Sequence, residues 1–192
     1  LGLSGGLLVS GVMAQTSFDQ QASNYVQDHI RSSHTEKWSS VAKVFGDRSV
    51  TLGLLGSSIG FHLISQKKHS YRFINRSMDH YLRAMLVGGP PFLFVQWALG
   101  ASRPSAKKPH SFYRPLQNSN SVSASGHSFA GALPFLVMAS EVENVWLKSF
   151  FYGVSTFTGL SRLHDHQHYV SQVLLGWWMA FLSVNVTTWT EA

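Results

Sequence analysis

Three short clusters hold the side chains best suited to chemistry. Arg103 follows an apolar stretch, Ser125-Gly126-His127 opens another, and Arg162 precedes His168 in the strip SRLHDHQHYVSQ. Arginine presents forked N–H donors that match phosphate oxygens, and the free N–H groups at a helix start bind anions. A histidine can act as nucleophile or general acid near neutral pH. Together these residue types predict a phosphoryl-transfer site that needs no metal.

The order and spacing of the clusters resemble the three signature motifs of the type 2 phosphatidic acid phosphatase family, which includes bacterial acid phosphatases and vanadium haloperoxidases. The first family motif is Lys, six residues, Arg-Pro, and the second is Pro-Ser-Gly-His. The third is Ser-Arg, five residues, His, three residues, Asp. Here Gln96 stands seven residues before Arg103, and Gln172 stands four after His168. The resemblance extends over residues 46–188, and the three motifs together are far more specific than any one alone.

The resemblance implies a mechanism through a phosphohistidine, with no cofactor. In the family pattern His168 attacks phosphorus, His127 protonates the leaving oxygen, and water then releases phosphate. The positions that match the phosphate-binding residues are Arg103, Arg162, Ser125, Gly126 through its N–H, and Gln96.

Three positions depart from the family pattern: Gln96 replaces the lysine, Ala124 the proline and Gln172 the aspartate. On a helix His168 and Gln172 share a face, so the Gln172 carbonyl can accept the His168 Nδ1–H. It cannot stabilise an imidazolium as a carboxylate would, and the analogous change in serine proteases costs about 10⁴ in rate. We therefore expect a modified, slower site, with Lys107 or Lys108 as candidates to replace the missing lysine charge.

Two other interpretations remain open. His164, Asp165, His166 and His168 could hold a metal ion, although their spacing matches no fixed ligand pattern. The two glutamines also fit a protein that binds phosphorylated lipids with little or no turnover.

The chain must fold so that these clusters meet. Apolar stretches at 49–65, 81–101, 128–140, 145–160 and 169–188 predict an all-α bundle of about five helices, and 81–101 and 169–188 are long enough to span a membrane. The polar segment 17–46 predicts amphipathic helices that precede the bundle. Residues 1–14 resemble the end of a signal peptide or an N-terminal anchor, which leaves 15–192 as a single phosphatase-like domain.

Composition restricts the partners. The chain lacks cysteine, which excludes disulfides and thiolate metal sites, and its net charge of +6 favours an anionic partner. No nucleic-acid motif is present. With the signal cleaved, the positive-inside rule puts the basic stretch 67–76 in the cytoplasm. The polar loop 102–127 and the polar strip 161–168 then both lie outside. The sequence therefore predicts a bacterial inner-membrane lipid phosphatase whose site faces the periplasm or exterior, or alternatively a soluble periplasmic acid phosphatase.

Overall fold

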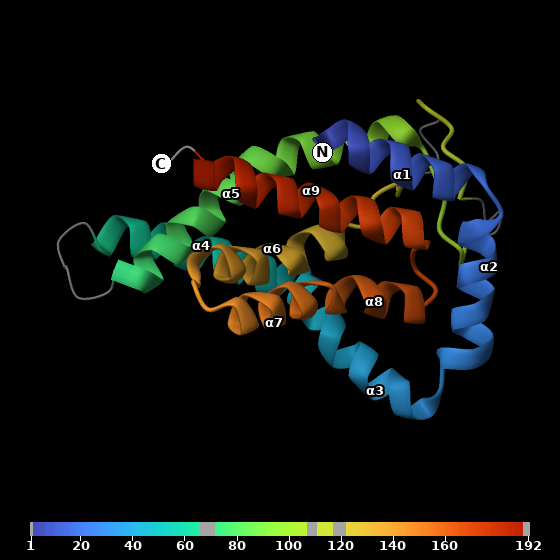
Figure 1. Ribbon diagram of the computed structural model, residues 1–192, viewed down its shortest axis with the longest axis horizontal. Helices are drawn as coiled ribbons and strands as arrows, with labels where there is room; N and C mark the ends of the chain where they lie inside the picture. Colours follow the sequence, from blue (N-terminus) through green and yellow to red (C-terminus); the bar gives the residue numbers. More distant parts are fainter. Residues whose placement is uncertain (1, 66–71, 107–110, 117–121, 190–192) are drawn as a thin grey trace.

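The computed structural model describes residues 2–65, 72–106, 111–116 and 122–189, and the regular structure in these ranges is entirely helical (Figure 1). The bundle is built from α4 (Arg48–Ser65), α5 (Arg72–Leu99), α6 (Gly126–Glu141), α7 (Val145–Ser155), α8 (Phe157–His164) and α9 (Val170–Trp189). It is preceded by α1 (Leu3–Gln15), α2 (Phe18–Tyr25), η1 (Val26–Ile30), α3 (Ser33–Ala42) and η2 (Lys43–Gly46). The predicted all-α fold is confirmed.

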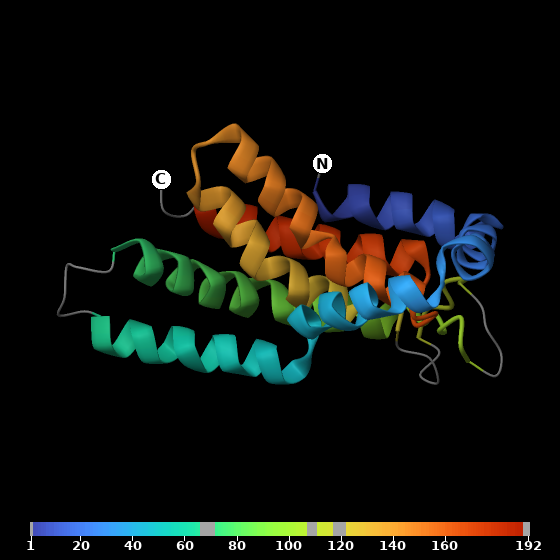
Figure 2. The same cartoon turned by 90° about the horizontal axis from the view of Figure 1, so that it is seen from below.

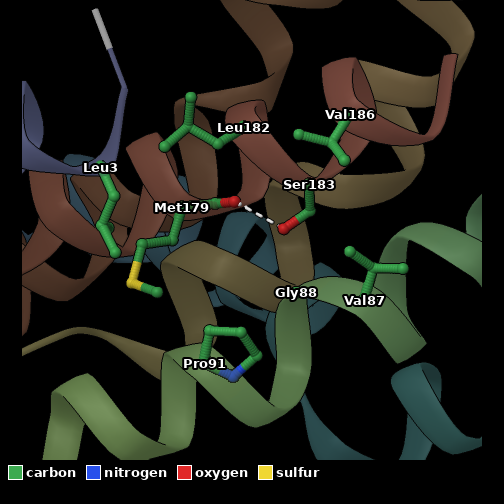
Figure 3. A pocket seen from close by; sticks show the side chains of 8 residues that line it. All are labelled: Leu3, Val87, Gly88, Pro91, Met179, Leu182, Ser183 and Val186. Atoms are coloured by element: carbon green, nitrogen blue, oxygen red, sulfur yellow. Dashed lines mark hydrogen bonds between the residues drawn. The ribbon is translucent and has the colours of Figure 1, made fainter. Parts of the chain in front are cut away.

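Helix α9 is the centre of the bundle and packs against α1, α5 and α6. Its buried face presents Leu175, Met179 and Ala180 to side chains of α6 such as Leu133 and Leu136. A small apolar cavity of about 160 Å³ remains between α1, α5 and the C-terminal half of α9, close to Met179 (Figure 3). The core thus runs along α9, the helix that begins two residues after His168.

The other helices extend this core on two sides. Helices α4 and α5 form an antiparallel pair (Figure 2). The predicted apolar stretch 145–160 is divided, because α7 ends at Ser155 and α8 begins at Phe157. Helix α3 lies across α8, so the segment before the bundle covers the strip that contains Arg162.

Two helical segments, Phe73–Leu99 and Val170–Thr188, are long and apolar enough to cross a membrane, although a core helix of a soluble protein passes the same test. Only 22% of the apolar window of the α5 segment is buried, and large apolar side chains also lie on the surface of α4 and α7, including Ile64 and Trp146. Exposed apolar surface of this extent marks a site of membrane or protein contact.

The N-terminal helix α1 packs directly on α9. Gly6 faces the Trp178 indole so closely that a Cβ at this position would overlap the ring. The division into a leader at 1–14 and a domain at 15–192 stays a prediction.

Candidate active site

The three clusters come together at one end of the bundle. This end holds the last turn of α5, the first turns of α6 and α9, and the C-terminal end of α8 (Figures 1 and 2). Burial is the main cause that lowers the pKa of His127 and of His168, and the nearby charges of Arg103 and Arg162 lower both further, so the four side chains lie near one another.

Gln172 joins all three clusters. Its Oε1 accepts a hydrogen bond from His168 Nδ1 at 2.9 Å, and its Nε2 donates to the Ser102 carbonyl at 2.8 Å. Its backbone carbonyl accepts the Ser125 N–H at 2.9 Å. The glutamine that replaces the family aspartate is therefore a fully buried link between the segments that carry Arg103, Ser125 and His168.

These bonds fix the tautomer of His168. Gln172 Oε1 also accepts the Tyr169 N–H at 3.3 Å, and its Nε2 can only donate, so the amide has one satisfactory orientation. His168 must then carry its proton on Nδ1, which leaves the lone pair on Nε2. Burial, together with the charges of Arg103, Arg162 and His127, lowers the pKa of His168 to about 3, although the Gln172 bond opposes this. The imidazole is therefore neutral at physiological pH.

Ser125 caps the N-terminus of α6. Its Oγ accepts the Ser128 N–H at 3.2 Å, as expected for a serine at this position. Gly176 of α9 lies against the same turn, and a Cβ there would come within 2.5 Å of the Ser125 carbonyl oxygen. Only glycine lets α9 approach this closely. The turn holds the first N–H groups of α6, beginning at Gly126, at the site end of the bundle.

Helix α8 ends in a tight reversal that sets Arg162 beside His168. The Gln167 N–H bonds to the Arg162 carbonyl at 3.0 Å and the His166 N–H to the Leu163 carbonyl at 3.1 Å, the pattern of a Schellman motif. His166 occupies the left-handed position, with φ of 56°, where glycine is usual. His166 is therefore a turn residue in this structure.

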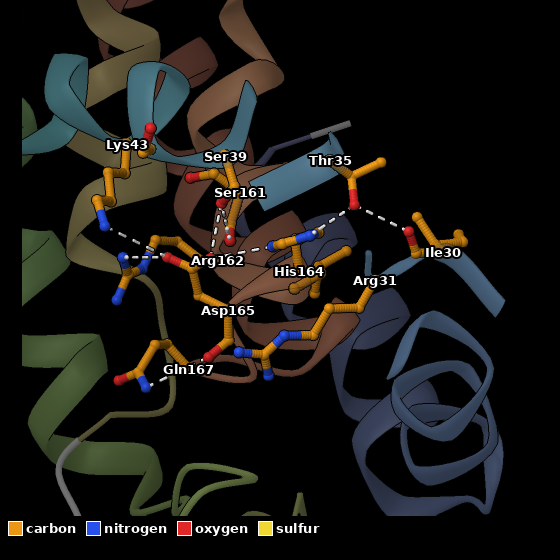
Figure 4. Close-up of polar contacts among 12 residues, drawn as sticks. Ile30, Arg31, Thr35, Ser39, Lys43, Ser161, Arg162, His164, Asp165 and Gln167 are labelled. Carbon is orange, nitrogen blue, oxygen red and sulfur yellow. Dashed lines mark hydrogen bonds and ion pairs between the residues drawn. The ribbon is translucent and has the colours of Figure 1, made fainter. Parts of the chain in front are cut away.

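Asp165 and the segment before the bundle support Arg162 (Figure 4). Asp165 Oδ2 lies 3.7 Å from Arg162 Nη1 and 3.9 Å from Lys43 Nζ, and its Oδ1 accepts from Ser39 Oγ at 2.7 Å. Burial works to raise the pKa of Asp165, but these partners and His164 outweigh it, so the pKa lies below its usual range and the group is ionised.

Both arginines retain donors for an anion. Among the residues that the structure describes, none accepts the buried Arg162 Nε–H. Arg103 is exposed, and its Nη1 donates to Gln167 Oε1 at 3.0 Å. A buried donor without a partner costs free energy, and a phosphate oxygen would satisfy it.

His127 pairs with Asp47, which stands at the start of α4. The distance from His127 Nε2 to Asp47 Oδ1 is 3.4 Å. Gly46 makes this approach possible, because a Cβ there would lie 2.6 Å from the His127 carbonyl oxygen. Burial lowers the pKa of His127, Arg162 and Arg103 lower it further, and Asp47 opposes them.

The side chain of Gln96 contacts the loop before α6. Its Nε2 donates to the Ala124 carbonyl at 2.8 Å, so it braces the turn that carries Ser125. Its assignment to phosphate binding stays a prediction. Lys107 and Lys108 lie outside the described residues.

The metal interpretation finds no support in the described ranges, where no group of three His, Cys, Asp or Glu side chains has the geometry to hold an ion. His164 Nε2 bonds to Thr35 Oγ1 at 3.0 Å and its Nδ1 to Asp165 at 3.1 Å, so it joins α8 to α3.

Sequence reasoning missed Asp47 and Ser102 as parts of the site, and it considered Asp165 only as a possible metal ligand. Ser102 directly precedes Arg103, and Asp165 lies between Arg162 and His168 in the third motif, so their positions in the sequence could have indicated them. Asp47 has only a weak signal: it follows Gly46 at the boundary between the polar segment 17–46 and the apolar stretch 49–65.

Comparison with known proteins gives a consistent result. No curated protein sequence matches the chain. Its fold is similar to the crystal structure of Aquifex aeolicus LpxE, with a TM-score of 0.67 and 12% identity over 92% of this chain and 98% of that one. The family model of the PAP2 superfamily matches residues 80–192, more than half of the chain, including all three motifs. The chain therefore belongs to the PAP2 superfamily, and this membership supports a phosphatase that acts on a lipid.

Proposed function

We propose that the protein hydrolyses a phosphomonoester or pyrophosphate on a membrane lipid through a phosphohistidine at His168, without a metal. The observation that carries this proposal is the His168–Gln172 bond of 2.9 Å, which directs a neutral imidazole lone pair into a site with two arginines. A nucleophile, an acid and anion donors at one helix end are the parts that phosphoryl transfer requires.

The first step forms the bond between His168 Nε2 and phosphorus and breaks the bond from phosphorus to the lipid oxygen. His127 gives its proton to that oxygen, and the lipid alcohol leaves, or the lipid phosphate in the case of a pyrophosphate. Arg103, Arg162 and the N–H groups at the start of α6 stabilise the charge on the remaining phosphate oxygens.

The second step uses water. His127, now neutral, accepts a proton as the water oxygen attacks phosphorus, the bond to Nε2 breaks and inorganic phosphate leaves. For the first step His127 must be protonated, and a bound phosphate dianion favours this because negative charge raises the pKa of a nearby histidine. Asp47 acts in the same direction.

Gln172 sets the speed of this chemistry. Phosphorylation of Nε2 with the proton retained on Nδ1 leaves a positive charge on the ring, which an amide stabilises less than a carboxylate. We therefore propose a working but slow enzyme. The alternative, a protein that binds phosphorylated lipid without turnover, is favoured by the same neutral Gln172 and by the engagement of Gln96 with Ala124.

The membrane is the proposed location, with the site at the periplasmic or outer face of a bacterial inner membrane. The exposed apolar surfaces of α4, α5 and α7 support it. A soluble periplasmic enzyme is the alternative, and extraction of the protein without detergent would favour it.

The test is phosphate release by purified protein from a panel of phosphorylated lipids in detergent with EDTA present. We expect release by the wild type, loss with His168→Ala, and no change with His34→Ala, which removes an exposed histidine. Saturable lipid binding without release would favour the binding protein, and full activity of His168→Ala would refute the mechanism.

A further inference from the structure

An apolar groove lies between α8 and α9, beside the candidate active site. Its volume is about 270 Å³, and its walls are formed mainly by Leu160, Leu163, Val170, Val173, Leu174 and Trp177. Leu163 directly follows Arg162, and Val170 stands two residues after His168. The groove therefore begins at the end of the bundle that holds the phosphate-binding side chains.

The polar atoms of the groove are already satisfied. The Ser128 hydroxyl donates to the Val173 carbonyl at 2.9 Å, and the Thr156 hydroxyl donates to the Gly153 carbonyl at 2.8 Å. The indole N–H of Trp177 donates to Ser155 Oγ at 2.8 Å. A polar guest would lose its bonds to water and gain few in return, so the groove favours an aliphatic one.

The groove is also open to the surface. Leu160 at its rim is 44% exposed although it lies next to buried core. From Val170 to Trp177 the groove follows two turns of α9, a length of about 10 Å. An extended alkyl chain advances somewhat less than one C–C bond of about 1.5 Å per carbon, so about eight carbons fill this length.

We infer that this groove binds the first part of one acyl or alkyl chain of the phosphorylated lipid whose phosphate lies between Arg103 and Arg162. This inference rests on the proposed function, because continuity with the phosphate site is what selects a substrate chain as the occupant. The cavity in Figure 3 lacks this continuity, since Met179 and Ser183 lie about 14 Å or more further along α9 than Val170.

The test compares a short and a longer alkyl phosphate, ethyl phosphate and octyl phosphate, both used as dissolved monomers. Leu160→Trp adds bulk at the rim without touching the catalytic side chains. We expect it to raise KM for octyl phosphate about tenfold, the equivalent of losing one or two buried methylenes, and to leave ethyl phosphate unchanged within about twofold. The matched control is Leu93→Trp, at a leucine of α5 that is 62% exposed and distant in sequence from the groove. This variant should leave KM unchanged for both esters.

A second readout does not depend on turnover. An alkyl phosphate with bromine near the chain end should quench the fluorescence of Trp177, and Trp177→Phe should remove this part of the signal. If the wild type hydrolyses neither ester but quenching persists, the catalytic proposal fails and the groove stands. If Leu160→Trp changed KM equally for both esters, the groove would not be the binding site of the chain. Equally strong quenching by the corresponding bromo-alcohol, which lacks the phosphate, would also refute the inference.

Discussion

Replacing Gln172 with aspartate tests the most unusual feature of the site. The wild-type side chain holds the His168 Nδ1–H at 2.9 Å and lies fully buried. Gln172→Asp introduces a negative charge beside the imidazole, but it shortens the side chain by one methylene and leaves the Ser102 carbonyl without its donor. The matched control is Gln172→Asn, which has the same length without the charge, so the difference between the two variants isolates the charge.

The expected effect follows from the distance. Two unit charges about 4 Å apart, at an effective dielectric constant of about 20, interact by about 4 kcal/mol. This corresponds to a rise of about 3 in the pKa of His168, from about 3 in the wild type to roughly 6 in the variant. The same energy stabilises the charged phosphohistidine, so turnover can rise by up to about 10³. The lost Ser102 bond costs about 1 kcal/mol of folding stability.

The assay is the pH dependence of kcat/KM for a soluble phosphate ester. Gln172→Asp should show an acid limb near pH 6 that the wild type and Gln172→Asn lack, with turnover at least about tenfold above that of Gln172→Asn. Identical profiles for the aspartate and asparagine variants would refute the view that charge at this position limits the site.

Three further predictions concern the surrounding residues. Asp47→Asn should lower the pKa of His127 further, because Asp47 opposes burial and the two arginines, so the basic limb of kcat/KM should move to lower pH; an unchanged limb would contradict the pairing. His166→Gly should leave activity intact and raise the free energy of unfolding by up to about 1 kcal/mol, because glycine removes the strain of a left-handed residue; a thermal melt measures this, and lost activity would assign His166 to the chemistry. The pKa of His168 in the folded protein lies below its unfolded value near 6.5, so the contribution of the neutral ring to stability is full above about pH 6.5 and declines as pH falls toward 3. At about pH 4.5 the free energy of unfolding of the wild type should have fallen by about 2 to 3 kcal/mol more than that of His168→Asn. Equal losses in the two proteins would show that the ring is solvated.

The sequence predicts the parts of the site that local geometry sets. The spacing of His168 and Gln172 predicts the hydrogen bond between them, and this bond is confirmed, although His168 lies two residues before α9 begins and not on the helix. Ser125 before an apolar run predicts a capped helix start, which is confirmed as well. The roles of Asp47 and Ser39 could not be predicted, because both reach the site through contacts with residues more than 75 positions away in the chain. The function of Gln172 as a link to Ser102 and Ser125 also depends on the packing of three separate segments.

The central claim is that His168 carries the phosphoryl group. It is tested most directly by rapid quenching of the enzyme during turnover of para-nitrophenyl phosphate, followed by mass spectrometry of the phosphorylated peptide. The assay uses the His127→Ala variant. Because para-nitrophenolate is a good leaving group, phosphorylation of His168 proceeds without a general acid, whereas hydrolysis of the phosphohistidine lacks its general base. We predict that a phosphohistidine accumulates at position 168 and is absent when His168→Ala is added. Phosphate release without a labelled protein, or a label on another residue, would contradict the account.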